Sequence, residues 1–143
     1  MKILVLNGPN LNLLGKRDKT QYGVLTLDDI EKILKDEFKE EYFEFFQSNH
    51  EGELIDKLHS AADYFDGVLI NPGGYSHTSV AIRDALELCK IPKVEVHLSN
   101  ISTREDFRHR TITAARCNGY VSGFKELSYT SGTYLLKKLH YNR

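Results

Sequence analysis

The segment from Asn7 to Gly23 combines side chains that can carry out proton chemistry. It reads NGPNLNLLGKRDKTQYG and follows a short apolar run. A loop of this length is uncommon in a compact domain and is usually functional or disordered. The mixture of asparagines, a basic pair and a tyrosine favours an ordered binding segment with a mobile, charged lid. Within it, Arg17 precedes Tyr22 by five residues, so a guanidinium group can lie beside a phenol.

Tyr22 becomes a candidate base if its phenol loses a proton. The unperturbed pKa of tyrosine is near 10, about three units too high for a base at neutral pH. A guanidinium about 4 Å away contributes roughly 4 kcal/mol at an effective dielectric constant of 20, which is comparable to those three units. Burial would oppose this effect by disfavouring the phenolate. The alternative is an exposed turn tyrosine before Gly23.

A second pair of titratable side chains is Glu95 and His97, in the run KVEVHL. Side chains alternate along a strand, so these two point to the same face, about 7 Å apart. In a sheet that is covered on both faces, Glu95 would be buried, and a buried carboxylate without a partner is costly. We therefore expect Glu95 to orient His97. The spacing fits equally well a buried structural histidine at the end of a strand.

The run NPGGYSHTSVAIRD, from Asn71 to Asp84, joins a glycine turn to the start of a helix. Backbone N–H groups in such turns and at helix N-termini bind oxygen-rich or anionic groups. His77 and Asp84 would share one helix face if the helix began early enough. The alternative is a tight turn with an N-cap, an exposed His77 and a solvated Asp84.

Two arginines, Arg104 and Arg108, lie four residues apart in a charged segment. On a short helix they would be neighbours. Two guanidinium groups on one face can bind a carboxylate or hydroxyls, or stabilise a nearby phenolate. The alternative is a solvated helix in which both arginines pair with Glu105 and Asp106.

Alternating apolar segments must position these side chains. Periodicity and turn signals predict strands at Lys2–Leu6, Tyr42–Gln47, Gly67–Ile70, Lys93–Leu98 and Tyr120–Gly123. They also predict five helices. One begins after a cap at Thr26, and another begins after a cap at Ser79 or Thr78; the other three cover Glu53–Phe65, about Thr103–Arg110, and Thr130–His140. The last helix is expected to pack on the core through Tyr134, Leu135 and Leu139. This alternation predicts an α/β fold: a doubly wound parallel sheet with helices on both faces.

Such sheets bind ligands beyond the carboxyl ends of the strands, where the strand order reverses. In the common order 2-1-3-4-5, the first and third strands are neighbours at that point. The loops that begin at Asn7 and Asn71 would then face each other, with His97 close by.

Length and composition favour a single domain over residues 1–143. The net charge of −1 gives no support to a nucleic acid or anionic membrane as partner. No apolar run approaches the roughly 20 residues of a membrane span, and we recognise no secretory signal. The cysteines, Cys89 and Cys117, lack metal-ligand spacing, so we expect no metal and a reducing, cytoplasmic location.

In combination, these motifs resemble the type II 3-dehydroquinases. The resemblance runs from Lys2 to about Phe124 and rests on NGPNLNLLGKRD with YG, FFQSNHEGELID, INPGGYSHTSVAIRDA, VEVHLSNI and REDFR. It implies a flavodoxin-like, three-layer αβα fold and assembly as trimers packed into a homododecamer. It also implies a cofactor-free anti elimination of water from 3-dehydroquinate through an enolate, which gives 3-dehydroshikimate in the shikimate pathway.

The resemblance implies a role for each candidate site residue. Tyr22 would be the base, Arg17 the lid arginine that stabilises its anion, and Asn10 the residue that holds a water at the enolate oxygen. His97 would be the general acid, with Glu95 behind it. Substrate contacts are implied for Asn71, His77 and Arg108 at the hydroxyls, for Leu98 and Ser99 at the carboxylate, and for Asp84, which a neighbouring subunit would contribute. Arg104 would be a second arginine near the lid, with an electrostatic role.

One alternative belongs to another class of protein. The same fold can serve as a non-catalytic module that binds a small anion or phosphate through the turn at residues 71–79. The known lysine-imine route to the same dehydration uses a barrel of eight βα units, which a chain of 143 residues cannot form.

Overall fold

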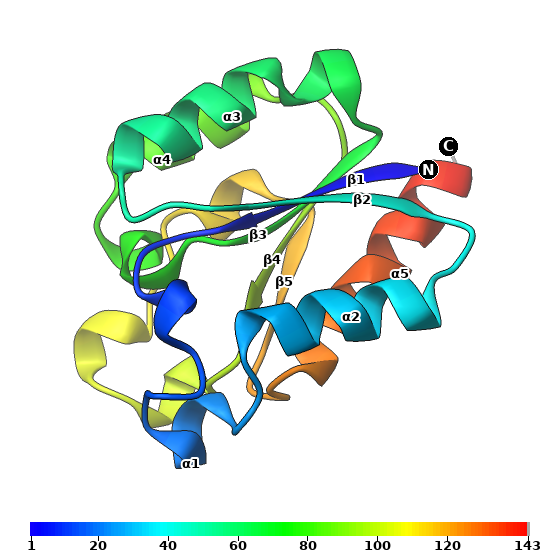
Figure 1. The fold of residues 1–143 in the computed structure, drawn as a ribbon. Helices are drawn as coiled ribbons and strands as arrows, with labels where there is room; N and C mark the ends of the chain where they lie inside the picture. Colours follow the sequence, from blue (N-terminus) through cyan, green and yellow to red (C-terminus); the bar gives the residue numbers. More distant parts are fainter. Residues whose placement is uncertain (143) are drawn as a thin grey trace.

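Five strands form one parallel sheet in the computed structural model, which describes residues 1–142 (Figure 1). The strand order is β2-β1-β3-β4-β5, as predicted. The strands are β1 (Lys2–Asn7), β2 (Tyr42–Gln47), β3 (Gly67–Asn71), β4 (Lys93–His97) and β5 (Gly119–Ser122). β1 and β3 each extend one residue beyond the predicted end, and β4 ends one residue before it. Asn7 and Asn71 are therefore the last residues of their strands and pair in register.

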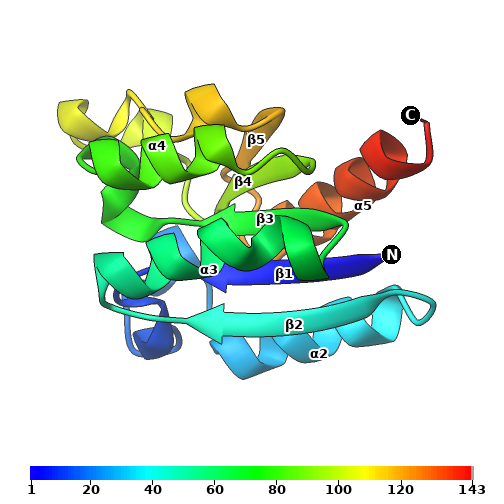
Figure 2. The ribbon, with the colours of Figure 1, turned by 90° about the horizontal axis from the view of Figure 1, so that it is seen from above.

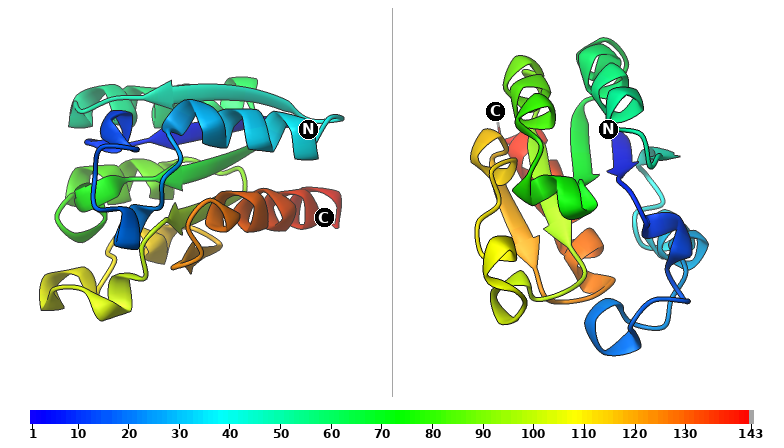
Figure 3. Two further views of the ribbon diagram at one scale, coloured as in Figure 1. Left: turned by 60° about the horizontal axis from the view of Figure 1, so that its bottom comes forward. Right: turned by 90° about the vertical axis from the view of Figure 1, so that its left-hand side faces the viewer.

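Four helices cover the sheet, two on each face (Figures 1 and 3). α2 (Leu27–Glu37) and α5 (Leu127–Tyr141) pack on one face, and α3 (Glu51–Tyr64) and α4 (Val80–Leu88) on the other. Figure 2 shows α3 and α4 side by side over the sheet. β1 divides its side chains between two buried clusters: Ile3 and Val5 face α2 and α5, whereas Leu4 and Leu6 face α3 and α4. This is the predicted three-layer αβα arrangement.

Side-chain caps fix where two of the helices begin. Thr26 accepts a hydrogen bond from the N–H of Asp29, and the Asp29 carboxylate accepts one from the N–H of Thr26. This capping box starts α2 at the predicted place. Ser79, rather than Thr78, caps α4 by accepting from the N–H of Ile82. Because α4 starts only at Val80, the condition for placing His77 on one helix face with Asp84 is not met.

The prediction of a helix over Thr103–Arg110 is wrong. Two 3-10 turns, η3 (Ile101–Thr103) and η4 (Asp106–Arg108), stand in its place, with Arg104 extended between them. The Asn100 side chain caps η3 by accepting from the N–H of Ser102, and Arg104 lies over the ring of the distant Tyr22 instead of continuing a helix. Two further 3-10 turns are η2 (Gly73–His77) and η5 (Ala114–Arg116).

The predicted core face of the last helix is also wrong. Tyr134, Leu135 and Leu139 are 54%, 42% and 36% exposed. The face of α5 that packs on the sheet instead carries Tyr129, Gly132, Thr133 and Leu136, among other buried residues. A Cβ at Gly132 would lie 2.6 Å from Leu69 Cδ1. Small side chains therefore let the helix approach the sheet, and hydrophobicity alone selects the opposite face.

The segment after β1 is ordered by short turns. η1 (Leu11–Leu13) and α1 (Lys19–Tyr22) lie within it, and α1 is capped by Asp18, which accepts from the N–H of Thr20. Leu11 and Leu14 are buried and anchor the segment to the core. Within residues 1–142, no helix has both the length and the apolar character needed to cross a membrane.

Candidate active site

A cavity lies at the carboxyl ends of β1, β3 and β4, where the strand order reverses. Its wall includes nine of the twelve predicted site residues: Arg17, Tyr22, Asn71, His77, His97, Leu98, Ser99, Arg104 and Arg108. Gly73, Gly74, Leu11 and Ile101 complete the wall. Parallel strands end at the same edge of a sheet, which is why segments far apart in the sequence meet here.

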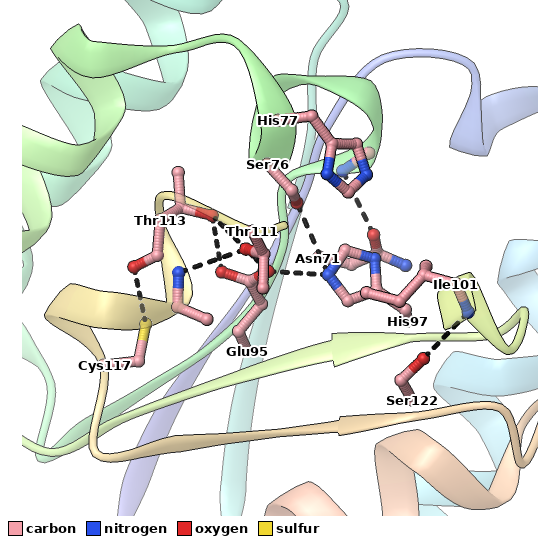
Figure 4. Close-up of polar contacts among 12 residues, drawn as sticks. Asn71, Ser76, His77, Glu95, His97, Ile101, Thr111, Thr113, Cys117 and Ser122 are labelled. Atoms are coloured by element: carbon pink, nitrogen blue, oxygen red, sulfur yellow. Dashed lines mark hydrogen bonds and ion pairs between the residues drawn. The ribbon is translucent and has the colours of Figure 1, made fainter. Parts of the chain in front are cut away.

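Glu95 and His97 form a direct hydrogen bond behind this wall (Figure 4). Glu95 is fully buried, and its Oε1 lies 2.6 Å from His97 Nε2. Two threonine hydroxyls, Thr111 Oγ1 and Thr113 Oγ1, also donate to the carboxylate, each at 2.6 Å. The buried carboxylate thus has the partners that its burial demands. The sequence analysis missed both threonines, although the expected burial of Glu95 signalled that donors were needed.

These contacts fix how the His97 ring is oriented. A carboxylate only accepts hydrogen bonds, so Nε2 of His97 carries the hydrogen of this pair. Ser76 Oγ lies 3.4 Å from the same nitrogen and is buried. Nδ1 of His97 makes no hydrogen bond to any other residue of the described part of the chain. When the ring is protonated, Nδ1 can therefore give its proton to a ligand in the cavity.

His77 presents a hydrogen-bond acceptor to the cavity, whereas His97 presents a donor. Its Nδ1 lies 2.8 Å from the carbonyl oxygen of Arg110, which can only accept, so Nδ1 carries the hydrogen. Burial lowers the pKa of His77, and positive charge from His97 and Arg108 lowers it further, while the bond to Arg110 opposes the shift. A neutral ring leaves Nε2 as an acceptor. The His77 and His97 rings are stacked, with centroids 6.2 Å apart.

The Asn71 amide is held by a buried network. Its Nδ2 donates to the Tyr129 hydroxyl at 2.9 Å, and its Oδ1 accepts from the N–H of Gly73. Tyr129 in turn donates to Asn7 Oδ1 at 2.6 Å, and burial raises the pKa of Tyr129, which keeps the phenol protonated. Asn71 therefore has one amide hydrogen left to donate. A donor at Asn71 and an acceptor at His77 suit a ligand hydroxyl.

Tyr22, the last residue of α1, lies beside two arginines. Arg17 Nη2 donates to the Tyr22 hydroxyl at 2.8 Å, and Arg17 Cζ lies 3.8 Å from the centre of the ring. Arg104 Cζ lies 5.1 Å from the same centre. Two guanidinium groups thus lie against the Tyr22 ring, and one of them donates to its hydroxyl.

The other end of the cavity suits an anionic group. Leu98 and Ser99 are buried, and their N–H groups donate to no other residue within positions 1–142. Arg104 Nη1 donates to Ser99 Oγ at 3.2 Å, while Arg104 Nε is buried without a hydrogen-bond partner in the described chain. Unused backbone donors next to a guanidinium group match a carboxylate. Arg108 also lines the cavity and pairs with Glu105 at 2.6 Å.

Three predicted site residues lie outside the wall. Glu95 stands behind His97, as described above. Asn10 is exposed, with a positive φ of 70°, and its N–H donates to Asn49 Oδ1. Asp84 is exposed on α4. Residues 1–142 hold no cluster of three or more His, Cys, Asp or Glu side chains arranged for a metal ion.

The cavity is closed by the segment that carries Arg17 and Tyr22. Its enclosed free volume is about 30 Å³, which is room for a water molecule rather than for a six-membered ring. A larger ligand therefore requires this segment to move. Arg17 and Tyr22 are both half-buried, and Tyr22 packs against the core cluster that contains Leu11 and Leu14.

Comparisons with known proteins agree with this geometry. The family model described as "Dehydroquinase class II" matches residues 1–137. The 3-dehydroquinate dehydratase of Thermotoga neapolitana is 52% identical over 97% of this chain and 96% of that protein. The crystal structure of the type II dehydroquinase from Butyrivibrio crossotus is 45% identical, with a TM-score of 0.93 over 96% of this chain and 97% of that one. That from Propionibacterium acnes is 39% identical, with a TM-score of 0.89 over 95% of this chain and 96% of that one. The chain therefore belongs to the class II dehydroquinase family.

Proposed function

We propose that this chain is a hydro-lyase that converts 3-dehydroquinate to 3-dehydroshikimate in the shikimate pathway, without a cofactor. The observation that carries the proposal is the pairing of Tyr22 and His97 in the wall of one cavity, each with its own charged partner. Elimination beside a ketone needs a base, a group that stabilises the enolate and an acid for the leaving hydroxyl. Family membership supports the same reaction.

Proton removal is the first step. The Tyr22 phenolate, stabilised by Arg17, takes a proton from the carbon beside the ketone, and the C–H electron pair moves to the carbonyl oxygen to give the enolate. Asn10 holds the water that donates to this oxygen. Asn10 lies in the same segment as Tyr22, and its N–H donates to Asn49 Oδ1 at 3.0 Å.

Loss of hydroxide as water is the second step. The enolate oxygen re-forms the carbonyl, and the electron pair of the enolate double bond forms the new C=C bond to the carbon that carries the hydroxyl. The C–O bond breaks, and His97 gives a proton from Nδ1 to the departing oxygen. Glu95 stabilises the protonated ring through Nε2 at 2.6 Å. An anti elimination requires the base and the acid to act on opposite faces of the ring, and we assign these two roles to Tyr22 and His97, which come from different segments of the cavity wall.

The remaining side chains hold the substrate in place. A ring hydroxyl accepts from the free amide hydrogen of Asn71 and donates to Nε2 of His77, because the other contacts of these two side chains leave one donor and one acceptor. The carboxylate binds the N–H groups of Leu98 and Ser99 and the Ser99 hydroxyl, near Arg104. Arg108 completes the hydroxyl contacts.

We further propose a single catalytic domain that assembles as trimers packed into a homododecamer in the cytoplasm. Asp84 is exposed, as it must be if a neighbouring subunit presents it to this cavity. Several large apolar side chains of α5, including Tyr134, Leu135 and Tyr141, are also exposed and available to an interface. Native mass measurement tests the assembly.

The decisive experiment mixes pure protein with 3-dehydroquinate and follows the ultraviolet absorbance of the conjugated enone. The proposal predicts steady formation of the enone in the presence of a metal chelator. Substrate binding without enone formation would instead favour a non-catalytic module that uses the turn at residues 71–79. Borohydride added during turnover should trap no adduct, whereas a lysine adduct would contradict the enolate route.

A further inference from the structure

The end of β5 extends the pairing of the sheet along the loop that carries the anion-binding groups. His97 pairs with Ser122 in the parallel β4–β5 ladder. Beyond that point, the N–H of Gly123 donates to the carbonyl of His97 at 3.2 Å, and the N–H of Lys125 donates to the carbonyl of Leu98 at 2.9 Å. These two carbonyls are therefore turned toward β5.

The Ser122 side chain continues this pairing where the backbone stops. Its hydroxyl donates to the carbonyl of Ser99 at 2.9 Å and accepts from the N–H of Ile101 at 3.3 Å. Figure 4 shows the second of these contacts. One hydroxyl thus binds the peptide groups on both sides of Asn100.

The loop approaches this strand end closely. Gly123 has a φ of 101°, and a Cβ at this position would lie 3.0 Å from the Cβ of Asn100. A hydroxyl as small as that of Ser122 fits beside this contact and reaches both peptide groups. The N–H groups of Leu98 and Ser99 belong to the peptide groups whose carbonyls, those of His97 and Leu98, are held on the β5 side. These two N–H groups have no partner in the described chain and lie next to the cavity that both residues line.

We propose that Ser122 is a positioning residue for the carboxylate of the substrate. It does not line the cavity itself. Its hydroxyl holds the peptide group that follows Ser99, while the N–H of Lys125 holds the peptide group that precedes Ser99 through the carbonyl of Leu98. The backbone of Ser99 is therefore fixed on both sides, so that its N–H group and its hydroxyl stay aimed at the carboxylate. This inference rests on the proposed function, because it assigns the anion at this end of the cavity to 3-dehydroquinate.

The test compares Ser122→Ala with the wild-type enzyme in the enone assay. One net hydrogen bond is worth roughly 1 kcal/mol, about a fivefold change in an equilibrium constant. We expect the KM for 3-dehydroquinate to rise about five- to tenfold in Ser122→Ala, with kcat within about twofold of wild type. Ser122→Thr, which keeps the hydroxyl, should restore the KM.

Ser102→Ala provides the matched control, since Ser102 lies in the same loop but is exposed, and its hydroxyl makes no hydrogen bond to any residue between 1 and 142. An unchanged KM in Ser122→Ala would overturn the inference. So would a drop in kcat at constant KM, because that would place the effect on His97 instead.

The methyl ester of 3-dehydroquinate separates a carboxylate effect from general loosening of the loop. With the ester, Ser122→Ala and wild type should have the same KM. An equal rise in KM for acid and ester would contradict the inference. Failure of the proposed function is distinct, because the wild-type enzyme would then produce no enone at all.

Discussion

Replacing Glu95 with glutamine tests how the buried carboxylate acts on His97. Glu95→Gln keeps the size of the side chain but turns a charge-assisted hydrogen bond at 2.6 Å into a neutral one. Hydrogen bonds to charged groups contribute about 1.5–3 kcal/mol, and neutral ones about 0.5–1.5 kcal/mol. The difference of about 1–2 kcal/mol corresponds to a loss of roughly 5- to 30-fold in kcat.

The fold should survive this change. The glutamine amide nitrogen can donate to Thr113 or Thr111, because a threonine hydroxyl can rotate and accept. Thermal unfolding and circular dichroism check this point, and initial rates of enone formation give kcat. Glu44→Gln is the matched control: Glu44 is also a strand glutamate with a cationic partner, Lys57 at 2.9 Å, but lies on the surface. If Glu95→Gln folds normally and its kcat stays within twofold of wild type, Glu95 does not act through His97.

Three further predictions concern the lid arginine Arg17, the loss of stability at acidic pH and the packing of α5. Arg17→Lys should lower kcat about tenfold or more in the enone assay, because lysine keeps the charge but loses the planar contact with the Tyr22 ring; a wild-type kcat would contradict this role. The pKa of His77 is lowered, so the unfolded chain binds this proton more readily, and His77 costs stability as the pH falls below about 6.5. Urea unfolding should therefore show that the free energy of unfolding of His77→Gln increases relative to that of wild type as the pH falls from 7.5 to 5.5. A difference between the two proteins that does not change with pH would refute the reasoning. Gly132→Ala should destabilise the fold by roughly 1–2 kcal/mol in the same assay, because its Cβ would overlap Leu69, whereas Gly52→Ala, with open space around it, should stabilise the fold by about 0.5–1 kcal/mol.

The sequence pattern predicted the strands and loops that position the site residues. The five strands come from short apolar runs bounded by turn residues, alternation of strands and helices predicts the parallel sheet, and the strand order is the common one for such sheets. Strand alternation placed Glu95 and His97 on one face, and topology brought the loops after β1 and β3 together. These features depend on neighbours in the sequence or on a general rule of parallel sheets.

Contacts between residues that lie far apart in the sequence were not predicted. Thr113 reaches Glu95 only because the segment before β5 folds back over β4, and Tyr129 reaches Asn71 from the far end of the chain. The buried face of α5 was misassigned because close helix–sheet packing favours glycine and threonine over leucine. The charged segment before Arg108 forms 3-10 turns with Arg104 extended between them, and Arg104 lies over the ring of Tyr22, a contact that spacing within the segment does not reveal.

The central claim is that the Tyr22 phenolate removes the proton and that His97 protonates the departing hydroxyl across one cavity. The most direct measurement is kcat for Tyr22→Phe with 3-dehydroquinate, which removes only the phenolic oxygen. General base catalysis contributes about 10²- to 10⁴-fold, so we predict a loss of that size with wild-type thermal unfolding and an unchanged assembly. A correctly folded Tyr22→Phe enzyme that forms the enone at the wild-type rate would contradict the account.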